Sequence, residues 1–426
     1  MGCSCGNTTS RCILITFVLI GLMNIWFQCY DISVKGLVFK HKNTAGRTLA
    51  THLSLYDTVT MKKNQKGIKS TYANLSMKKR KVNEDIMCID RINTVAFLKV
   101  HKAGSTTVMN IFLRYGESHG LNIALPRVPK SKEPSYWNYL GVDTVLQKER
   151  LIPIPQNESY SIICNHVVYS KDKFKEIIGQ DVVNIGIIRH PASLFLSGAY
   201  YWHIVDILRK RIRGENDNER MSKYLKHPDL FERFMHNRMS FDFGLPVKYF
   251  DNDTAIDDKL KSLDTEFSLI MLLEYFVESL VLMKRILCWD LKDILFIPIN
   301  EYSKEKRNKI KLSPDDMSNL QKYNHADFRL YQYFEKKFMR QLNKTSHNFH
   351  EEVEHFKSVQ ETVSVYCKNR TIDQFAEVLT IKETVWNNSF NITVEECKFM
   401  MEQELQLLRR LGKKAENKYR QRKKYD

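Results

Sequence analysis

The sequence lacks several motifs that would place the protein in a familiar functional class. It has no Walker A loop, because that motif sets a lysine directly after its last glycine, whereas Lys102 precedes Gly104. It has no H-E-x-x-H sequence and no paired-cysteine spacing of the kind that binds zinc. Zinc-finger, aromatic RNP and basic-zipper patterns are also missing. These absences disfavour an ordinary ATPase or GTPase, a metal-dependent enzyme and a nucleic-acid-binding protein.

Acidic residues are the minority among the charged residues, with 49 Asp and Glu against 66 Lys and Arg, which leaves a formal net charge of +17. This excess favours anionic partners but does not select among them, and most of the lysines are expected to form a solvated surface. Two clusters concentrate the positive charge, at residues 78–81 and 413–424. Both are predicted to be exposed, mobile segments.

Charged residues are absent from one stretch near the N-terminus, residues 12–30. A helix of this length spans roughly 30 Å of hydrocarbon. A cleaved signal peptide is the alternative, but no small-x-small cleavage site follows closely, and the run is longer than the usual apolar core of such a peptide. The sequence therefore predicts a single transmembrane signal anchor in type II orientation, with residues 1–11 as a cytoplasmic tail.

Cysteines are few downstream of this anchor, where five remain, and the same region holds seven N-x-[ST] sequons. The number of sequons fits a lumenal domain of the secretory pathway, where disulfides form. Because five is odd, at least one cysteine stays unpaired, and connectivity cannot be deduced from spacing. The one pair that we predict joins Cys367 to Cys397, since both lie in the C-terminal region. The sequons begin at Asn74, Asn157, Asn252, Asn343, Asn369, Asn387 and Asn391.

Residues 31–90 are polar, lysine-rich and weakly periodic, which predicts a stem between the anchor and a folded domain. From residue 91 onward, apolar stretches alternate with helical patterns, without an internal repeat. Such alternation is typical of an α/β fold, a parallel sheet flanked by helices that binds ligands at the carboxyl ends of its strands. The predicted strands cover residues 95–100, 160–164, 181–188 and 294–297.

Four helices have clear signals in the second half of the chain. Residues 274–289 show apolar positions at helical spacing, which predicts a core helix. Ser313 and Pro314 have the residue types of an N-cap and a first helical position. They lead into an aromatic-rich packing helix over residues 323–342, and residues 397–411 are predicted to form an amphipathic helix.

The stretch 95–110 reads as a buried strand, a short turn and the first turns of a helix. Unpaired N–H groups at a helix start point toward an anion, and the helix dipole favours negative charge there. Lys102 adds a mobile positive charge. Three hydroxyls, those of Ser105, Thr106 and Thr107, add donors. This pattern predicts a phosphate site.

A second anion site is predicted where the strand over residues 181–188 ends. Arg189 follows that strand directly, and its planar guanidinium suits phosphate oxygens, although a structural salt bridge is the alternative role. Pro191 suits the first turn of the next helix, and Ser197 lies about two helical turns after Arg189. Two phosphate sites on neighbouring strand ends would suit a ligand phosphorylated at two separated positions.

These two motifs resemble the 5′-phosphosulfate loop and the 3′-phosphate site of sulfotransferases that use 3′-phosphoadenylyl sulfate (PAPS). The chain is most similar to the galactose-3-O-sulfotransferases, which include galactosylceramide sulfotransferase. The resemblance covers about residues 91–345 and rests on the stretches 97–107, 112–117, 121–126, 164–166, 241–245, 274–282, 285–289, 312–315 and 327–331.

The resemblance implies a catalytic domain of P-loop-like sulfotransferase fold over residues 91–345, followed by a helical extension with a basic tail over 346–426. It implies a type II protein of the Golgi membrane that sulfates the 3-hydroxyl of a terminal galactose on a glycolipid or glycan. PAPS is the implied co-substrate, and the chemistry needs no metal. Lys102 is then expected to neutralise the leaving group. The other residues expected to hold the donor are Ala103, Gly104, Ser105, Thr106, Thr107, Arg189 and Ser197.

The acceptor hydroxyl needs a base, and histidine is suited to that role near neutral pH. His166 is the first candidate, because related carbohydrate sulfotransferases place a base histidine in a similar segment, and His101 is the second. A hydrogen-bonded structural histidine is the alternative for both. His190 stands where many sulfotransferases have a small or acidic residue. Aromatic contact with the sugar is expected from the segment 200–203, although such runs more often belong to a core.

Two other functions remain open from the sequence. A uronosyl 2-O-sulfotransferase acting on glycosaminoglycans would suit the basic surface, although the galactose-type stretches argue against it. A catalytically inactive, membrane-anchored glycan-binding protein could keep the fold, but the chain retains Lys102, Ser105, Arg189, Ser197 and His166. The identity of the acceptor and the oligomeric state do not follow from the sequence.

Overall fold

The computed structural model describes residues 90–127, 138–141, 143–228, 232–297, 310–345, 347–370 and 378–422. The predicted anchor, the stem up to residue 89, the basic cluster at 78–81 and the sequon at Asn74 lie outside these ranges. Among the helices inside them, none combines the length and the apolar character that a membrane crossing requires.

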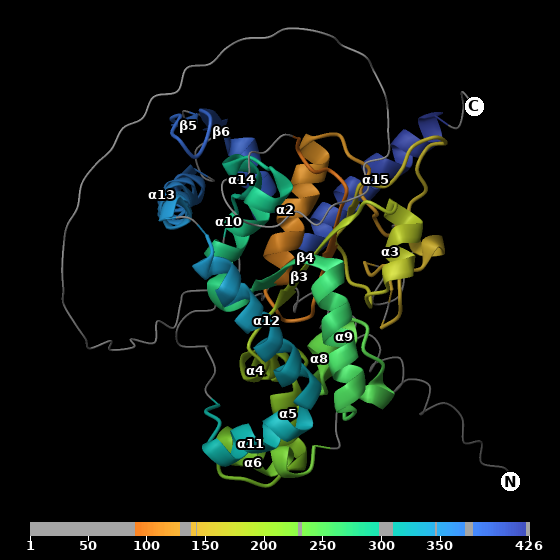
Figure 1. Cartoon of the computed structure of the whole chain (residues 1–426), viewed down its shortest axis with the longest axis vertical. Coiled ribbons are helices and arrows are strands. Elements are labelled where there is room, and N and C mark those ends of the chain that lie inside the picture. The colour runs from red at the N-terminus through yellow and green to blue at the C-terminus, as the bar shows by residue number, and fades with distance from the viewer. Residues whose placement is uncertain are drawn as a thin grey trace, which may run out of the picture.

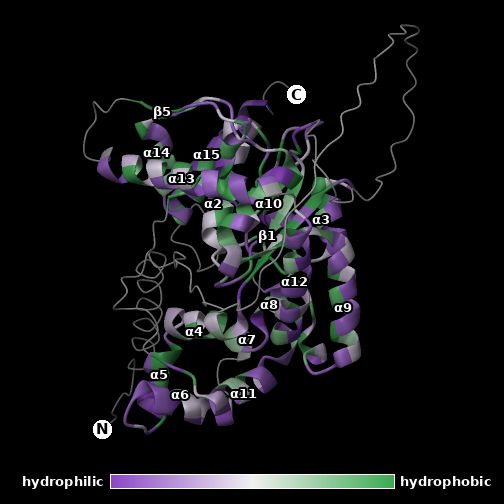
Figure 2. Ribbon diagram, turned by 60° about the vertical axis from the view of Figure 1, so that its left-hand side comes forward, coloured by the Kyte–Doolittle hydropathy of each residue, from purple (hydrophilic) through white to green (hydrophobic). Residues whose placement is uncertain are grey.

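A four-stranded parallel sheet lies at the centre of the fold (Figure 1). Its order is β2 (Ile162–Ile163), β1 (Val95–Leu98), β3 (Val183–Ile188) and β4 (Phe267–Leu272). Val95 of β1 pairs with Ile162 on one side and with Val183 on the other. Helices flank the sheet, so the strands are buried and almost continuously apolar, as is typical of parallel sheets. Figure 2 shows this hydrophobic centre around β1.

Three of the four predicted strands are confirmed, and the fourth is wrong. Residues 291–294 form a short 3-10 turn, and residues 295–297 have no regular structure, so the sheet ends with β4 instead. The predicted strand over residues 294–297 and the observed strand β4 are both short, apolar and largely buried. Periodicity alone cannot separate a buried strand from another buried segment of this kind.

The buried apolar side chains of the helices and the sheet form two clusters. The larger one includes the strands, α2 (Ser105–Ser118), α10 (Phe276–Leu287) and α12 (His325–Asn343). The smaller one joins α4 (Pro191–Tyr201), α5 (Ile204–Arg211), α6 (Asp217–Lys226) and α11 (Pro314–Tyr323), which lie together at the lower end of Figure 1. The remaining elements are η1 (Lys148–Arg150), α3 (Lys171–Ile178), α7 (Glu232–Met235), α8 (Arg238–Asp242), η2 (Val247–Tyr249), α9 (Asp253–Glu266), η3 (Leu273–Tyr275), η4 (Leu291–Ile294), α13 (His347–Arg370), β5 (Leu379–Ile381), β6 (Phe390–Ile392), α14 (Val394–Met401) and α15 (Glu404–Arg422).

The helix predictions hold for α10, α11 and α12. Ser313 caps α11 in a capping box, since its hydroxyl accepts from the Asp316 backbone N–H and the Asp316 carboxylate accepts from the Ser313 N–H. The single helix predicted over 397–411 is wrong, because Glu402 is extended and divides the segment into α14 and α15. The predicted disulfide between Cys367 and Cys397 is confirmed and links α13 to α14.

The basic C-terminal segment is an ordered helix and not the mobile tail that its composition predicts. Helix α15 packs against α2 and continues to Arg422. Its cationic side chains form ion pairs with carboxylates from the first half of the chain. Nζ of Lys414 lies 3.0 Å from Oε1 of Glu117, and Nζ of Lys418 lies 2.9 Å from Oε2 of Glu158. Charge density along a sequence does not reveal such partners, which come from segments more than 250 residues away.

Candidate functional site

The loop between β1 and α2 has the geometry of an anion site. Gly104 occupies the N-cap position of α2 with a φ of 72°, a left-handed conformation that favours glycine. A Cβ atom at this position would lie 2.5 Å from Cδ1 of Leu273, so a larger residue would clash. Within the described part of the chain, no side chain caps the first N–H groups of α2. These donors are thus available to an anion at the carboxyl end of β1.

Two of the three predicted hydroxyls already have protein partners. Ser105, which is buried, donates to the backbone oxygen of Val100 at 2.6 Å and so closes the loop. Thr106 donates to the carboxylate of Glu404 at 3.1 Å. Thr107 is half-buried in the first turn of α2, and Ala103 is buried beneath the loop.

The structure places the two predicted anion motifs side by side. Because β1 and β3 are neighbours, Arg189 at the end of β3 reaches the first loop, and its Nη1 donates to the backbone oxygen of Lys102 at 3.2 Å. The ammonium of Lys102 lies 3.7 Å from the ring centre of Tyr201, a cation–π contact. Ser197 lies in α4, the helix that begins just after Arg189, and its side chain is buried.

His101, within this loop, forms a hydrogen-bonded pair with Asp242. Nδ1 of His101 lies 2.8 Å from Oδ2 of Asp242, which also accepts from the His101 backbone N–H at 2.9 Å. Burial opposes ionisation of Asp242, but the guanidinium of Arg238 and His101 outweigh it and lower the pKa of this carboxyl. Nδ1 also lies 3.1 Å from Nη2 of Arg238, which can only donate. The shorter contact with the ionised carboxylate, which only accepts, favours the proton on Nδ1 and leaves the lone pair on Nε2.

Arg238 holds Asp242 from the other side. It is 2 % exposed, and its Nη2 lies 2.9 Å from Asp242 and 2.8 Å from Asp143. Burial, reinforced by the positive charge of Arg238, lowers the pKa of His101 below its ordinary value of 6.5. His101 is therefore neutral at physiological pH, as a general base must be.

His166 is held differently from His101. Its Nδ1 bonds the backbone oxygen of Lys99 at 3.0 Å, so Nδ1 carries the proton, and its Nε2 lies 3.0 Å from the Lys99 ammonium. Burial and the charge of Lys99 lower its pKa well below 6.5. The two histidine rings stack with their centres 4.1 Å apart, and Tyr139 packs against both. Both nitrogens of His166 thus already have protein partners.

Of the other residues predicted from the sequence, some lie in the candidate site and others pack or form hydrogen bonds outside it. Tyr201 contacts Lys102, and the ring of Trp202 lies 6.4 Å from that of His101. The hydroxyl of Tyr200 instead accepts from the Ile310 backbone N–H within the smaller apolar cluster, and His203 pairs with Asp206 at the surface. The backbone N–H of His190 donates to Glu274.

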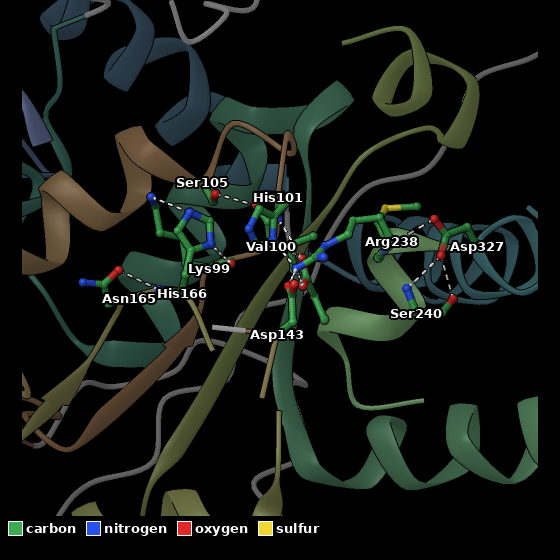
Figure 3. A network of polar contacts seen from close by, with 12 residues as sticks. Lys99, Val100, His101, Ser105, Asp143, Asn165, His166, Arg238, Ser240 and Asp327 are labelled. Carbon is green, nitrogen blue, oxygen red and sulfur yellow. Dashed lines mark hydrogen bonds and ion pairs between the residues drawn. The ribbon is translucent and has the colours of Figure 1, made fainter. Parts of the chain in front are cut away.

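A buried carboxylate sets the position of α8, the helix that carries Arg238 and Asp242. Asp327 is 0 % exposed and accepts from the backbone N–H groups of Met239 and Ser240 and from the Ser240 hydroxyl, at 2.7–3.1 Å (Figure 3). Burial raises the pKa of Asp327 to about 6. The carboxylate thus binds the N-terminal turn of α8 and fixes its orientation beside His101.

Replacing Asp327 with alanine is expected to lower the free energy of unfolding by about 2–4 kcal/mol, because three buried donors lose their acceptor. Denaturant unfolding of the full chain measures this change. Asp258→Ala, at an exposed position of α9, is the matched control and should change stability little. A loss for Asp327→Ala no larger than that of the control would contradict the role assigned to this carboxylate.

A family model for galactose-3-O-sulfotransferases matches residues 33–414 of the chain, most of its length. The chain belongs to the galactose-3-O-sulfotransferase family. The match also extends into α14 and α15, beyond the region 91–345 that carries the sequence resemblance.

Relatives with curated names are about 27–29 % identical to this family member over the stretches that align. It is 27 % identical over 256 residues to galactosylceramide sulfotransferase of Bos taurus, covering 58 % of this chain and 57 % of the relative. It is 27 % identical over 287 residues to galactose-3-O-sulfotransferase 2 of Mus musculus, covering 65 % of this chain and 70 % of the relative. The chain thus matches under three fifths of the length of the galactosylceramide sulfotransferases.

Sequence reasoning missed four charged residues of this site, namely Lys99, Arg238, Asp242 and Glu404. Lys99 and Asp242 lie inside stretches that carry the family resemblance, so the sequence marked their segments but assigned no role to these two residues. Glu404 lies outside those stretches and had no signal. Among the described residues, no group of three or more His, Cys, Asp and Glu side chains is arranged to hold a metal ion, and a metal-free reaction stays a prediction.

Proposed function

We propose that this protein transfers the sulfuryl group of PAPS to the 3-hydroxyl of a terminal galactose on a glycolipid or glycan. The observation that carries the proposal is the contact between Arg189 and Lys102, which joins the two predicted anion sites beside a histidine whose pKa is lowered. A donor with a 5′-phosphosulfate and a 3′-phosphate needs two such positions. Membership of the galactose-3-O-sulfotransferase family supports galactose over a uronic acid as the acceptor.

The proposed reaction is an in-line displacement at sulfur. Nε2 of His101 takes the proton of the galactose hydroxyl while its oxygen bonds to sulfur, and the bond from sulfur to the bridging oxygen of the 5′-phosphate breaks. Lys102 neutralises the negative charge that develops on that oxygen, and adenosine 3′,5′-bisphosphate leaves. Because the reaction resembles phosphoryl transfer, positioning and charge stabilisation account for most of the acceleration.

We assign the base to His101 ahead of His166, which reverses the order suggested by the sequence. Asp242 orients the His101 ring and leaves Nε2 with a lone pair, the arrangement of a general base backed by a carboxylate. In His166 the corresponding lone pair faces the Lys99 ammonium. His166 then supports the ring of His101 from the side by stacking.

Transfer of radiolabelled sulfate from PAPS to a panel of acceptors tests this function. The purified full chain in detergent would be given galactosylceramide, lactosamine glycans and heparan-type chains. We expect label on a galactose-terminated acceptor, at the 3-hydroxyl. No transfer to any galactose-terminated lipid or glycan would overturn the proposal, and label on heparan alone would favour the uronosyl alternative.

Replacing Arg189 with alanine should weaken binding of adenosine 3′,5′-bisphosphate by about 10- to 100-fold, because a charge-assisted contact with the 3′-phosphate is lost. Isothermal titration calorimetry measures this affinity without an acceptor. Arg209→Ala, which removes a surface arginine paired with Asp206 and Asp217, is the control. Unchanged affinity in Arg189→Ala would remove this residue from the donor site.

We also propose a Golgi membrane location in type II orientation, with residues 12–30 as the anchor and the folded domain in the lumen. The uncharged run, the sequons and the disulfide between Cys367 and Cys397 support this arrangement. Protease protection of intact Golgi vesicles, combined with glycosidase digestion, tests it. Cleavage of the domain by protease outside intact vesicles would contradict the orientation.

A further inference from the structure

Glu404 places a carboxylate inside the candidate site from the far end of the chain. It is the first residue of α15, and its Oε2 accepts from the Lys99 ammonium at 2.8 Å and from the Thr106 hydroxyl at 3.1 Å. Its side chain is 15 % exposed. The segment that follows the predicted catalytic domain therefore contributes directly to the environment of the phosphate loop.

The ammonium of Lys99 needs this carboxylate because it is almost fully buried. Lys99 is 2 % exposed and follows β1 directly, so its side chain lies among the apolar residues around the sheet. An uncompensated charge in such a place is strongly unfavourable. Glu404 is the ion-pair partner of Lys99 among the described residues, and Nε2 of His166 takes a further hydrogen bond from the same ammonium.

One carboxylate thus links the two halves of the site. Through Thr106 it contacts the first turn of α2, where the donor phosphate is proposed to bind. Through Lys99 it reaches His166, whose ring stacks on His101 (Figure 3). A change in the position of Glu404 would alter both the donor end and the base end of the site.

The surroundings of Glu404 hold it in a defined position. Three leucines of α15 that follow it, Leu407, Leu408 and Leu411, are buried in the larger apolar cluster. Upstream, the disulfide fixes α14 to α13. Precise placement of this kind is what a supporting residue in an active site requires.

We propose that Glu404 is a positioning residue for sulfuryl transfer: it fixes the Lys99 ammonium against His166 and the start of α2 in the geometry that the reaction needs. This inference rests on the proposed function and adds to it a part for the C-terminal helix. Glu404 does not touch the reacting atoms, so its effect passes through Lys99 and Thr106.

The test compares Glu404→Gln, Glu404→Ala and the control Glu402→Gln in the full chain. Glu402 belongs to the same segment but pairs with Arg410 at the surface. We expect kcat to fall about tenfold or more in Glu404→Ala, the scale on which supporting residues act, with a smaller loss in Glu404→Gln, which keeps an acceptor oxygen. The control should keep wild-type kcat. Thermal unfolding of each variant identifies any general loss of structure.

A double-mutant cycle with Lys99→Met separates positioning from a merely structural role. If Glu404 acts through Lys99, then Glu404→Gln should lower kcat much less in the Lys99→Met background than in the wild type. Wild-type kcat in both Glu404 variants would overturn the inference, and equal fold losses in the two backgrounds would overturn its claim that Glu404 acts through Lys99. Tighter binding of adenosine 3′,5′-bisphosphate with kcat retained would also overturn it, since Glu404 would then be an obstruction. An inactive wild type would instead contradict the proposed function.

Discussion

Replacing His101 with alanine is expected to lower kcat by about 10²–10⁴-fold, the usual contribution of a general base. His166→Ala should cost less, because His166 supports the neighbouring ring and its lone pair already faces Lys99. Sulfate transfer to the best acceptor measures both variants under saturating PAPS. The ratio between the two losses decides between the assignments.

The control for the histidine variants is His325→Gln, which removes a surface histidine paired with Asp253. Its turnover should match that of the wild type. If His166→Ala lost more activity than His101→Ala while both stayed folded, the base would be His166, and the stacked partner would be His101. Wild-type rates in His101→Ala would remove it from catalysis altogether.

The pH dependence of kcat/KM also tests the assignment of His101 as the base. A base must be neutral, and burial together with the charge of Arg238 lowers the pKa of His101. As the pH falls, His101 is protonated only below its ordinary value of 6.5, so the acid limb of the profile is expected below pH 6.5. An acid limb clearly above that pH would contradict a buried histidine as the base.

Replacing Lys102 with methionine should lower kcat by about 10²–10³-fold, because the negative charge on the bridging oxygen loses its neutralising partner in the transition state. Affinity for adenosine 3′,5′-bisphosphate should fall much less, since Arg189 and the N–H groups of α2 remain. Kinetics and calorimetry on the same preparation separate the two effects.

Lys173→Met is the matched control for Lys102, because Lys173 pairs with Glu176 on the exposed side of α3. Its kcat and its nucleotide affinity should both stay at the wild-type level. A large loss of nucleotide affinity in Lys102→Met without a loss of kcat would assign Lys102 to ground-state binding. In that case the leaving group would have to be neutralised by another cation.

Membership of the family and the geometry of α15 together extend the functional unit toward the C-terminus. The composition of the last part of the chain indicates a charged tail, yet Lys414 and Lys418 pair with carboxylates of the sheet domain. The disulfide and Glu404 lie in this same segment. We therefore expect the segment to act with the domain that carries the loop and not as an appendage.

The sequence by itself determined the parts of the site that are local in the chain. The stretch 95–110 and the stretch around Arg189 each contain a strand, a turn and a helix start within a few residues, so short-range patterns are enough to predict them. Because parallel strands end at the same edge, the sequence also predicted that the two loops lie near each other, as the contact between Arg189 and Lys102 confirms.

Only the tertiary structure decided which charged groups meet at that edge. Asp242 is 141 residues from His101, and Glu404 is 305 residues from Lys99, so no periodicity in the chain relates them. Their pairing depends on how α8 and α15 pack, which in turn depends on Asp327, the disulfide and the buried leucines. A hydrogen-bonding role such as that of His101 or His166 is set by these distant partners, and therefore could not be read from the histidines alone.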